Sequence, residues 1–111
     1  KRESMEHIVI KTDEEAVYIL PEDVGAIIRE PDIWEIPEGD REILGISPYK
    51  GSLVIYYRLG KREDSQCGII LRKRREDGML YGIAASNAGI EEISEELLEE
   101  IQPGVWGKKR D

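Results

Sequence analysis

Histidine and cysteine, two of the residue types that most often catalyse reactions or bind transition metals, occur once each in this sequence of 111 residues. His7 is the only histidine and Cys67 the only cysteine, which disfavours a His–Cys zinc cluster and the usual Cys–His or Ser–His catalytic pairs. Each lies in a short apolar run typical of a β-strand, so we expect both to be ordinary strand residues, with Cys67 packed in the core. A single cysteine also excludes an internal disulfide.

Adjacent carboxylates are the other candidates for acid–base chemistry. They occur as Glu14-Glu15, Glu91-Glu92 and Glu99-Glu100, on polar segments where water solvates both members of each pair and neither is tuned for proton transfer. The glycine-rich phosphate-binding patterns GxGxxG and GxxxxGK[ST] are absent from the sequence. We therefore expect a protein that is not an enzyme and that requires no metal and no cofactor.

The composition is acidic and typical of one small domain. The chain carries 24 Asp and Glu against 16 Lys and Arg, a formal net charge of −8, and 40% of its residues are hydrophobic. This charge opposes nonspecific binding to nucleic acid and to anionic membranes. No apolar run approaches the roughly 20 residues that cross a bilayer, and no signal-peptide pattern is present. We expect a soluble, cytoplasmic protein with a single domain over residues 5–111, preceded by residues 1–4 as an added or disordered stretch.

Two basic features nevertheless raise the possibility of a nucleic-acid-binding barrel. The run "LRKRRED", from Leu71 to Asp77, leads into an expected hairpin tip, where its cations would be solvated. The stretch from Lys50 to Tyr57 shares the Lys-Gly start and the final aromatic of an RNA-binding RNP1 strand. Ser52 and Val54 stand where that strand would carry its base-stacking aromatics, so this alternative is the less favoured one.

The elements that must position these residues read mainly as short strands. Two β-prone runs, 8–10 and 16–20, are separated by a polar connection of hairpin length, and residues 21–31 are expected to be extended or irregular because prolines bracket them. Alternation from Leu53 onward predicts a half-buried strand with a rather apolar second face. Strands at about 67–74 and 79–85 flank Asp77-Gly78, a strong hairpin turn.

Capping signals predict two short helices between these strands. Asp40 is a candidate N-cap for a single turn that ends near Leu44. Ser94 is a candidate N-cap for a helix over Glu95–Ile101, with Ile93 packing on Leu98. Together these elements predict an all-β fold, a small antiparallel barrel or sandwich with short helices.

Six pieces of the sequence occur in an order that carries a family likeness. They are "AVYILPEDVGAIIRE", "DIWEIP", "EILGISPYKGSLVIYYRL", "CGIILRKR", "LYGIAASNAGIEEIS" and "IQP", spanning about Ile8 to Pro103. This order resembles the CheW-like domain, the adaptor module of bacterial chemotaxis arrays. The resemblance implies two intertwined SH3-like β-barrels. It also implies a noncatalytic signalling scaffold whose partners are a chemotaxis histidine kinase, a chemoreceptor or another CheW-like chain.

The resemblance also implies a partner-binding surface at Val24, Gly45, Lys50 and Gly51. Lys50 and Gly51 match the family's "RG" turn, Gly45 matches the glycine of "LG", and Val24 matches the apolar position of "V.eIi". The sequence departs from the family pattern at four positions, where arginine, proline and two aspartates are replaced by Lys50, Ile55, Arg58 and Ser86 respectively.

Overall fold

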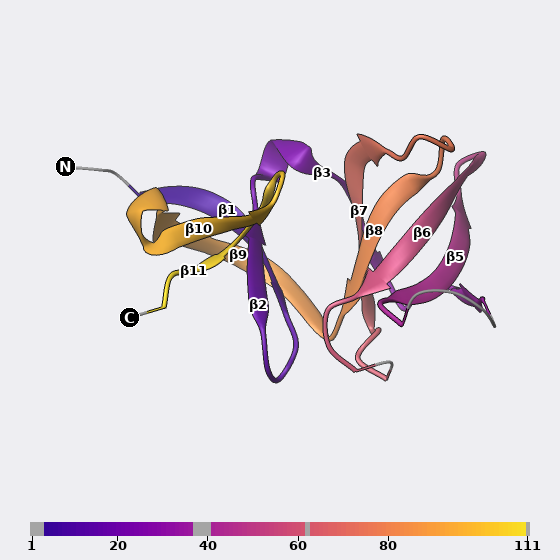
Figure 1. The fold of residues 1–111 in the computed structure, drawn as a ribbon, viewed down its shortest axis with the longest axis horizontal. Coiled ribbons are helices and arrows are strands. Elements are labelled where there is room, and N and C mark those ends of the chain that lie inside the picture. Colours follow the sequence, from indigo (N-terminus) through magenta and orange to yellow (C-terminus); the bar gives the residue numbers. More distant parts are fainter. Residues whose placement is uncertain (1–3, 37–40, 62, 111) are drawn as a thin grey trace.

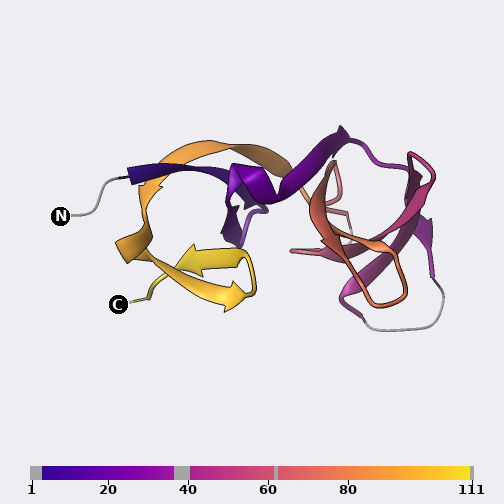
Figure 2. The ribbon, with the colours of Figure 1, turned by 90° about the horizontal axis from the view of Figure 1, so that it is seen from above.

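The computed structural model describes residues 4–36, 41–61 and 63–110, which fold into two β-sheets, each curled into its own lobe (Figures 1 and 2). The first lobe holds β1 (Ser4–Lys11), β2 (Ala16–Ile19), β9 (Asn87–Ser94), β10 (Leu98–Gln102) and β11 (Val105–Lys108). The second lobe holds β3 (Val24–Arg29), β4 (Trp34–Glu35), β5 (Ile43–Tyr49), β6 (Ser52–Arg58), β7 (Cys67–Arg74) and β8 (Leu80–Ala85). The predicted all-β fold with SH3-like barrel character is confirmed.

The first lobe is built from both ends of the described chain, in the strand order β10-β11-β2-β1-β9. The predicted opening hairpin is confirmed, because β1 pairs antiparallel with β2 through partners such as Ile8 and Ile19. On its other side β1 pairs with β9 over its full length, from Ser4 opposite Ser94 to Lys11 opposite Asn87. His7 is an ordinary residue of β1, as expected: it is 2% exposed and its ring lies edge-on to Tyr18.

The second lobe is one continuous segment with the strand order β3-β7-β8-β6-β5-β4. The predicted β7–β8 hairpin is confirmed, with β8 beginning one residue later than expected. Its turn closes through Arg75 N donating to Met79 O at 2.8 Å, and Gly78 supplies the positive φ of 89°. The pairing of β6 with β8 is parallel, so the described part of this sheet is mixed rather than purely antiparallel.

Tyr56 is the largest buried side chain inside the second lobe. It packs with Leu44, Val54, Ile70 and Ala84. Burial raises the pKa of the Tyr56 hydroxyl to about 12, with a smaller contribution from Tyr49. The Tyr56 hydroxyl therefore stays neutral well above the pH at which an exposed tyrosine ionises.

Both predicted helices are largely replaced by strands. Asp40 lies outside the described residues, Arg41 and Glu42 form a turn, and Ile43 already begins β5. The predicted helix ending at Leu44 is therefore wrong over its described part, because pairing of β5 with both β4 and β6 outweighs one capping signal.

The C-terminal helix is reduced to a single turn. Ser94 does cap it, since its Oγ accepts from Glu96 N at 3.4 Å, but the 3-10 turn covers only Glu95–Leu97. Residues from Leu98 onward form β10 instead, paired with β11. The expected packing of Ile93 on Leu98 is confirmed, because both belong to one buried cluster.

Candidate partner-binding surface

Lys50 and Gly51 form the tip of the β5–β6 hairpin. Tyr49 and Ser52 are the last paired residues before it, and both tip residues have positive φ, 45° for Lys50 and 80° for Gly51. Two positive φ values in a two-residue turn are typical of type I′, in which asparagine and glycine are the favoured residues. At this positive φ a lysine is less favourable for stability than an asparagine would be. The turn conformation alone therefore does not account for the lysine, and its charged side chain is the feature to consider. Lys50 is exposed, with its Nζ 5.4 Å from the centroid of the Tyr49 ring.

Gly45 is buried in β5, where it lies opposite Glu35 of the paired strand β4. A Cβ at this position would overlap the carbonyl oxygen of Trp34 and would lie 2.7 Å from the Trp34 carbonyl carbon. The absence of a side chain therefore lets β4 approach closely enough to pair with β5. Gly45 has no side chain to offer a partner, and its contribution to any surface is to hold Trp34 in place.

Val24 begins β3 at the junction between the two lobes. It is half-buried, pairs with Leu71 of β7 and packs against an apolar cluster that both lobes form, with Ile10 from the first lobe and Ile69 from the second. The structure thus brings Lys50 and Gly51 together in one turn and sets Gly45 in the same strand pair. In the sheet order, β7, β8 and β6 lie between β3, which carries Val24, and β5.

An exposed apolar face on the outside of the second lobe was not predicted as a site. We call Trp34, Ile46, Pro48 and Leu53 the outer apolar face. Trp34 lies opposite Ile46 and Pro48 opposite Leu53, and residues two apart along β5 share a side of the sheet. Trp34 is 53% exposed and Leu53 42% exposed. The alternation pattern placed Leu53 on the face of β6 opposite Val54 and Tyr56 without saying which face meets solvent, and the structure buries Val54 and Tyr56 and exposes Leu53.

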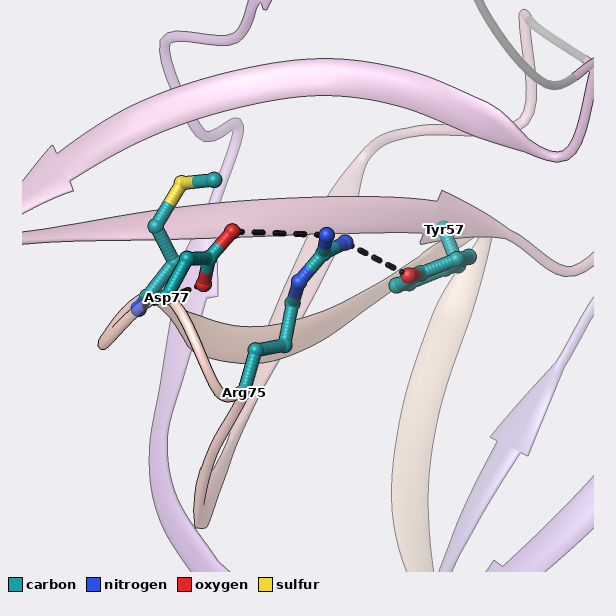
Figure 3. A network of polar contacts seen from close by, with 4 residues as sticks. Tyr57, Arg75 and Asp77 are labelled. Carbon is teal, nitrogen blue, oxygen red and sulfur yellow. Dashed lines mark hydrogen bonds and ion pairs between the residues drawn. The ribbon is translucent and has the colours of Figure 1, made fainter.

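The basic run lies beside the Lys-Gly turn. Figure 1 shows the β5–β6 and β7–β8 hairpins ending at the same side of the second lobe, and Arg74 links them by donating to Ser52 Oγ at 3.2 Å. Arg72, Lys73 and Arg74 are exposed, as expected for a solvated tip. Arg75 is instead half-buried: its Nη1 donates to the Tyr57 hydroxyl at 2.9 Å and its Nη2 lies 3.3 Å from Asp77 Oδ2 (Figure 3).

A cavity of about 450 Å³ lies between the lobes. Its apolar wall comes from both lobes, with Val17 and Val105 on one side and Leu71, Tyr81 and Ile83 on the other. Charged side chains, including Glu15 and Arg58, also line it. Arg58 is held in place, because its Nε donates to Arg41 O at 2.8 Å.

The described residues carry no arrangement typical of a metal centre. Within 4–36, 41–61 and 63–110, no three or more His, Cys, Asp or Glu side chains gather as a group that could hold an ion. Val54, which occupies an interior position of the RNP1-like stretch, is fully buried and therefore cannot stack on a base. Across the described ranges, no helix has the length and apolar character needed to cross a membrane.

Comparisons with known proteins connect this geometry to one fold. No family model and no curated protein sequence matches the chain. The structure is similar to the crystal structure of the scaffolding protein TtCheW from Thermoanaerobacter tengcongensis, with a TM-score of 0.65 and 23% sequence identity. The match covers 93% of this chain and 73% of that chain. The chain therefore has the fold of a CheW-like domain.

Proposed function

We propose that this protein, which has the fold of a CheW-like domain, is a noncatalytic signalling adaptor that couples partner proteins through its surface. The observation that carries the proposal is the structural match to a scaffolding protein over 93% of the chain. Its partners on this proposal are a chemotaxis histidine kinase, a chemoreceptor or another CheW-like chain. The ordered sequence pieces from Ile8 to Pro103 support the same conclusion independently of the coordinates.

The four proposed partner-binding residues have distinct roles in this scheme. Lys50 is an exposed charge at the rim of the outer apolar face, and Gly51 permits the turn that presents it. Gly45 seats β4, and with it the exposed ring of Trp34. Val24 joins β3 to the lobe junction. On this scheme apolar contact supplies affinity and the rim charge tunes association and partner choice.

A pull-down with the tagged protein from a lysate of the native organism tests the proposal. We expect a chemotaxis kinase, a chemoreceptor or a CheW-like chain in the bound fraction. Failure to recover any of these, together with retention on heparin that falls steeply with salt, would replace the adaptor with a nucleic-acid-binding barrel.

Lys50→Glu is expected to weaken binding of a recovered partner by about two- to fivefold at low salt and less at high salt. An exposed charge contact contributes about 1 kcal/mol or less, and salt screens it. The measurement is partner affinity at two salt concentrations, with thermal unfolding as the check on folding.

Two matched variants separate charge from turn geometry in that experiment. Lys50→Asn removes the charge and suits positive φ, so it should weaken binding less than Lys50→Glu without lowering thermal stability. Lys11→Glu reverses an exposed charge in the first lobe and should leave binding unchanged. Equal affinity for Lys50→Glu and the parent at both salt concentrations would remove Lys50 from the surface.

A further inference from the structure

Lys50 at the tip of the β5–β6 hairpin and three cations at the end of β7 form one basic surface, which we call the basic tip and define as Lys50, Arg72, Lys73 and Arg74. All four side chains are exposed. One hydrogen bond links the two hairpins, from Arg74 to Ser52 Oγ at 3.2 Å, while the second bond of Arg74, to Gly78 O at 2.7 Å, stays within the β7–β8 hairpin. Lys50 therefore belongs to the same charged surface as the basic run, although 22 residues separate Ser52 from Arg74 in the sequence.

Within the part of the chain that the structure describes, none of these four cations forms an ion pair with a carboxylate. Among the described residues, the ion pair formed in this region is that of Arg75 with Asp77, and Arg75 is not a member of the basic tip. Lys73 lies over the ring of Tyr81 at 5.2 Å, and Lys50 over that of Tyr49 at 5.4 Å. The basic tip thus keeps charge and hydrogen-bond donors available for a partner.

The excess of acidic over basic side chains lies in the first lobe, whereas the basic tip lies in the second. Residues 4–23 and 87–110 contain twelve acidic and four basic side chains, whereas the described residues from 24 to 86 contain eight acidic and nine basic ones. The molecule is 47 Å long, and the Debye length in physiological salt is about 8 Å. Asp23 of the first lobe lines a pocket with Arg72 and Lys73, so the acidic lobe adjoins that side of the basic tip. Screening leaves a partner at Lys50 and Arg74 exposed mainly to local positive charge, despite the formal net charge of −8.

The surroundings of the basic tip favour a short acidic protein segment over a nucleic acid. The aromatic rings beside these cations are already engaged, because Tyr57 stacks on Tyr81 with centroids 6.0 Å apart, Lys73 lies over Tyr81, and Lys50 lies over Tyr49. A nucleic-acid strand that followed Arg72 and Lys73 toward the first lobe would meet Asp23, which lines a pocket with both cations and would repel a phosphate. Leu53 and Pro48 of the outer apolar face lie just below the tip, so apolar side chains of a protein segment would find contacts there.

We propose that the basic tip docks an acidic, partly apolar segment of a protein partner. The proposal rests on the adaptor function and names the chemistry of one segment that the adaptor binds. Carboxylates of that segment contact Lys50, Lys73 and Arg74, and its apolar residues lie on the outer apolar face. The guanidinium of Arg74, already oriented by two hydrogen bonds, offers its remaining donors to a carboxylate.

Fluorescence anisotropy with a short labelled peptide rich in glutamate and leucine tests this docking. At about 50 mM salt, where screening is weak, the Lys50→Glu/Arg74→Glu variant should bind the peptide at least about tenfold more weakly than the parent. Lys50→Ala/Lys73→Ala, which keeps the hydrogen bonds of Arg74, should lose about threefold or more. The control Lys108→Glu/Lys109→Glu reverses two exposed cations of the first lobe and should bind as the parent does.

Three results would overturn the proposal. One is equal peptide affinity in the parent and both tip variants when thermal unfolding shows all of them folded. Another is tighter binding of a single-stranded oligonucleotide of equal charge, lost in the same variants, which would assign the tip to nucleic acid. The third is self-association of the parent that the tip variants abolish, which would assign it to the acidic lobe of a second copy.

The pull-down distinguishes failure of this inference from failure of the adaptor function. If a chemotaxis kinase, chemoreceptor or CheW-like chain is recovered equally by the parent and the charge-reversed variant, the adaptor function stands and the basic tip has no part in it. If the parent recovers none of these proteins, the adaptor function itself fails.

Discussion

Val24→Asp should destabilise the protein by about 3 kcal/mol or more, because it places a carboxylate against an apolar cluster that offers it no partner. Val24 packs on the apolar cluster at the lobe junction, which joins Ile10 of the first lobe to Ile69 of the second. The change therefore weakens the junction as well as one strand. Thermal or urea unfolding measures it, and for a chain of this size the loss corresponds to a fall in Tm of about 12 °C or more.

The matched control is Ile27→Asp on the same strand. Ile27 is 48% exposed, so a carboxylate there keeps water around it and should cost about 1 kcal/mol or less. Equal stability losses for the two variants would contradict the placement of Val24 at the lobe junction. For the same reason, loss of partner binding in Val24→Asp would report unfolding, and Ile27→Asp is the better probe of β3 as a surface.

Gly45→Ala is the second change with a large expected effect. Its new methyl group would overlap the carbonyl of Trp34, which is backbone and cannot rotate away. We expect a loss of about 2 kcal/mol, within the range for overpacked sites, and displacement of β4 from β5. Unfolding experiments give the first quantity. Increased solvent quenching of Trp34 fluorescence, measured in a Trp106→Phe background, gives the second.

Gly89→Ala is the control for that experiment. A Cβ on Gly89 would meet only Val9 Cγ1, at 3.9 Å, so alanine should be tolerated there and, by restricting the unfolded chain, could add a few tenths of a kcal/mol. If Gly45→Ala were as stable as Gly89→Ala with unchanged tryptophan quenching, β4 would not depend on Gly45.

Turn and capping residues in the sequence correctly predicted the parts of this fold that depend only on neighbouring residues. The Asp77-Gly78 turn and the hairpin around it follow from a glycine that accepts positive φ between two alternating runs. The cap at Ser94 was predicted for the same reason, since a hydroxyl seeks nearby backbone amides. The strand β10 after that cap was not predicted. From Leu98 onward the chain pairs with β11, and no local pattern encodes the partner of a strand.

In the candidate site, too, some features could be predicted from the sequence and others could not. Lys50 and Gly51 could be assigned to a hairpin tip from the sequence, and the resemblance attached a partner-binding role to them. The contact of Arg74 with Ser52 could not be anticipated, because it depends on β6 and β8 lying parallel and adjacent. The half-burial of Val24 likewise depends on the first lobe packing against β3, which no periodicity within residues 21–31 reveals.

The route of the chain between the lobes has a consequence for folding kinetics. β1 pairs with β9 through partners such as Ile8 and Ile90, with the whole second lobe inserted between them. Closing so long a loop in an unfolded chain is entropically costly and slow. A second lobe that has already folded holds the ends of β2 and β9 close together and shortens the effective loop. We therefore expect amides of β7 and β8 to gain protection before those of β9 in pulse-labelled hydrogen exchange, and the reverse order would contradict this. The first lobe is then a structure that forms only after its insert has drawn the two ends of the chain together.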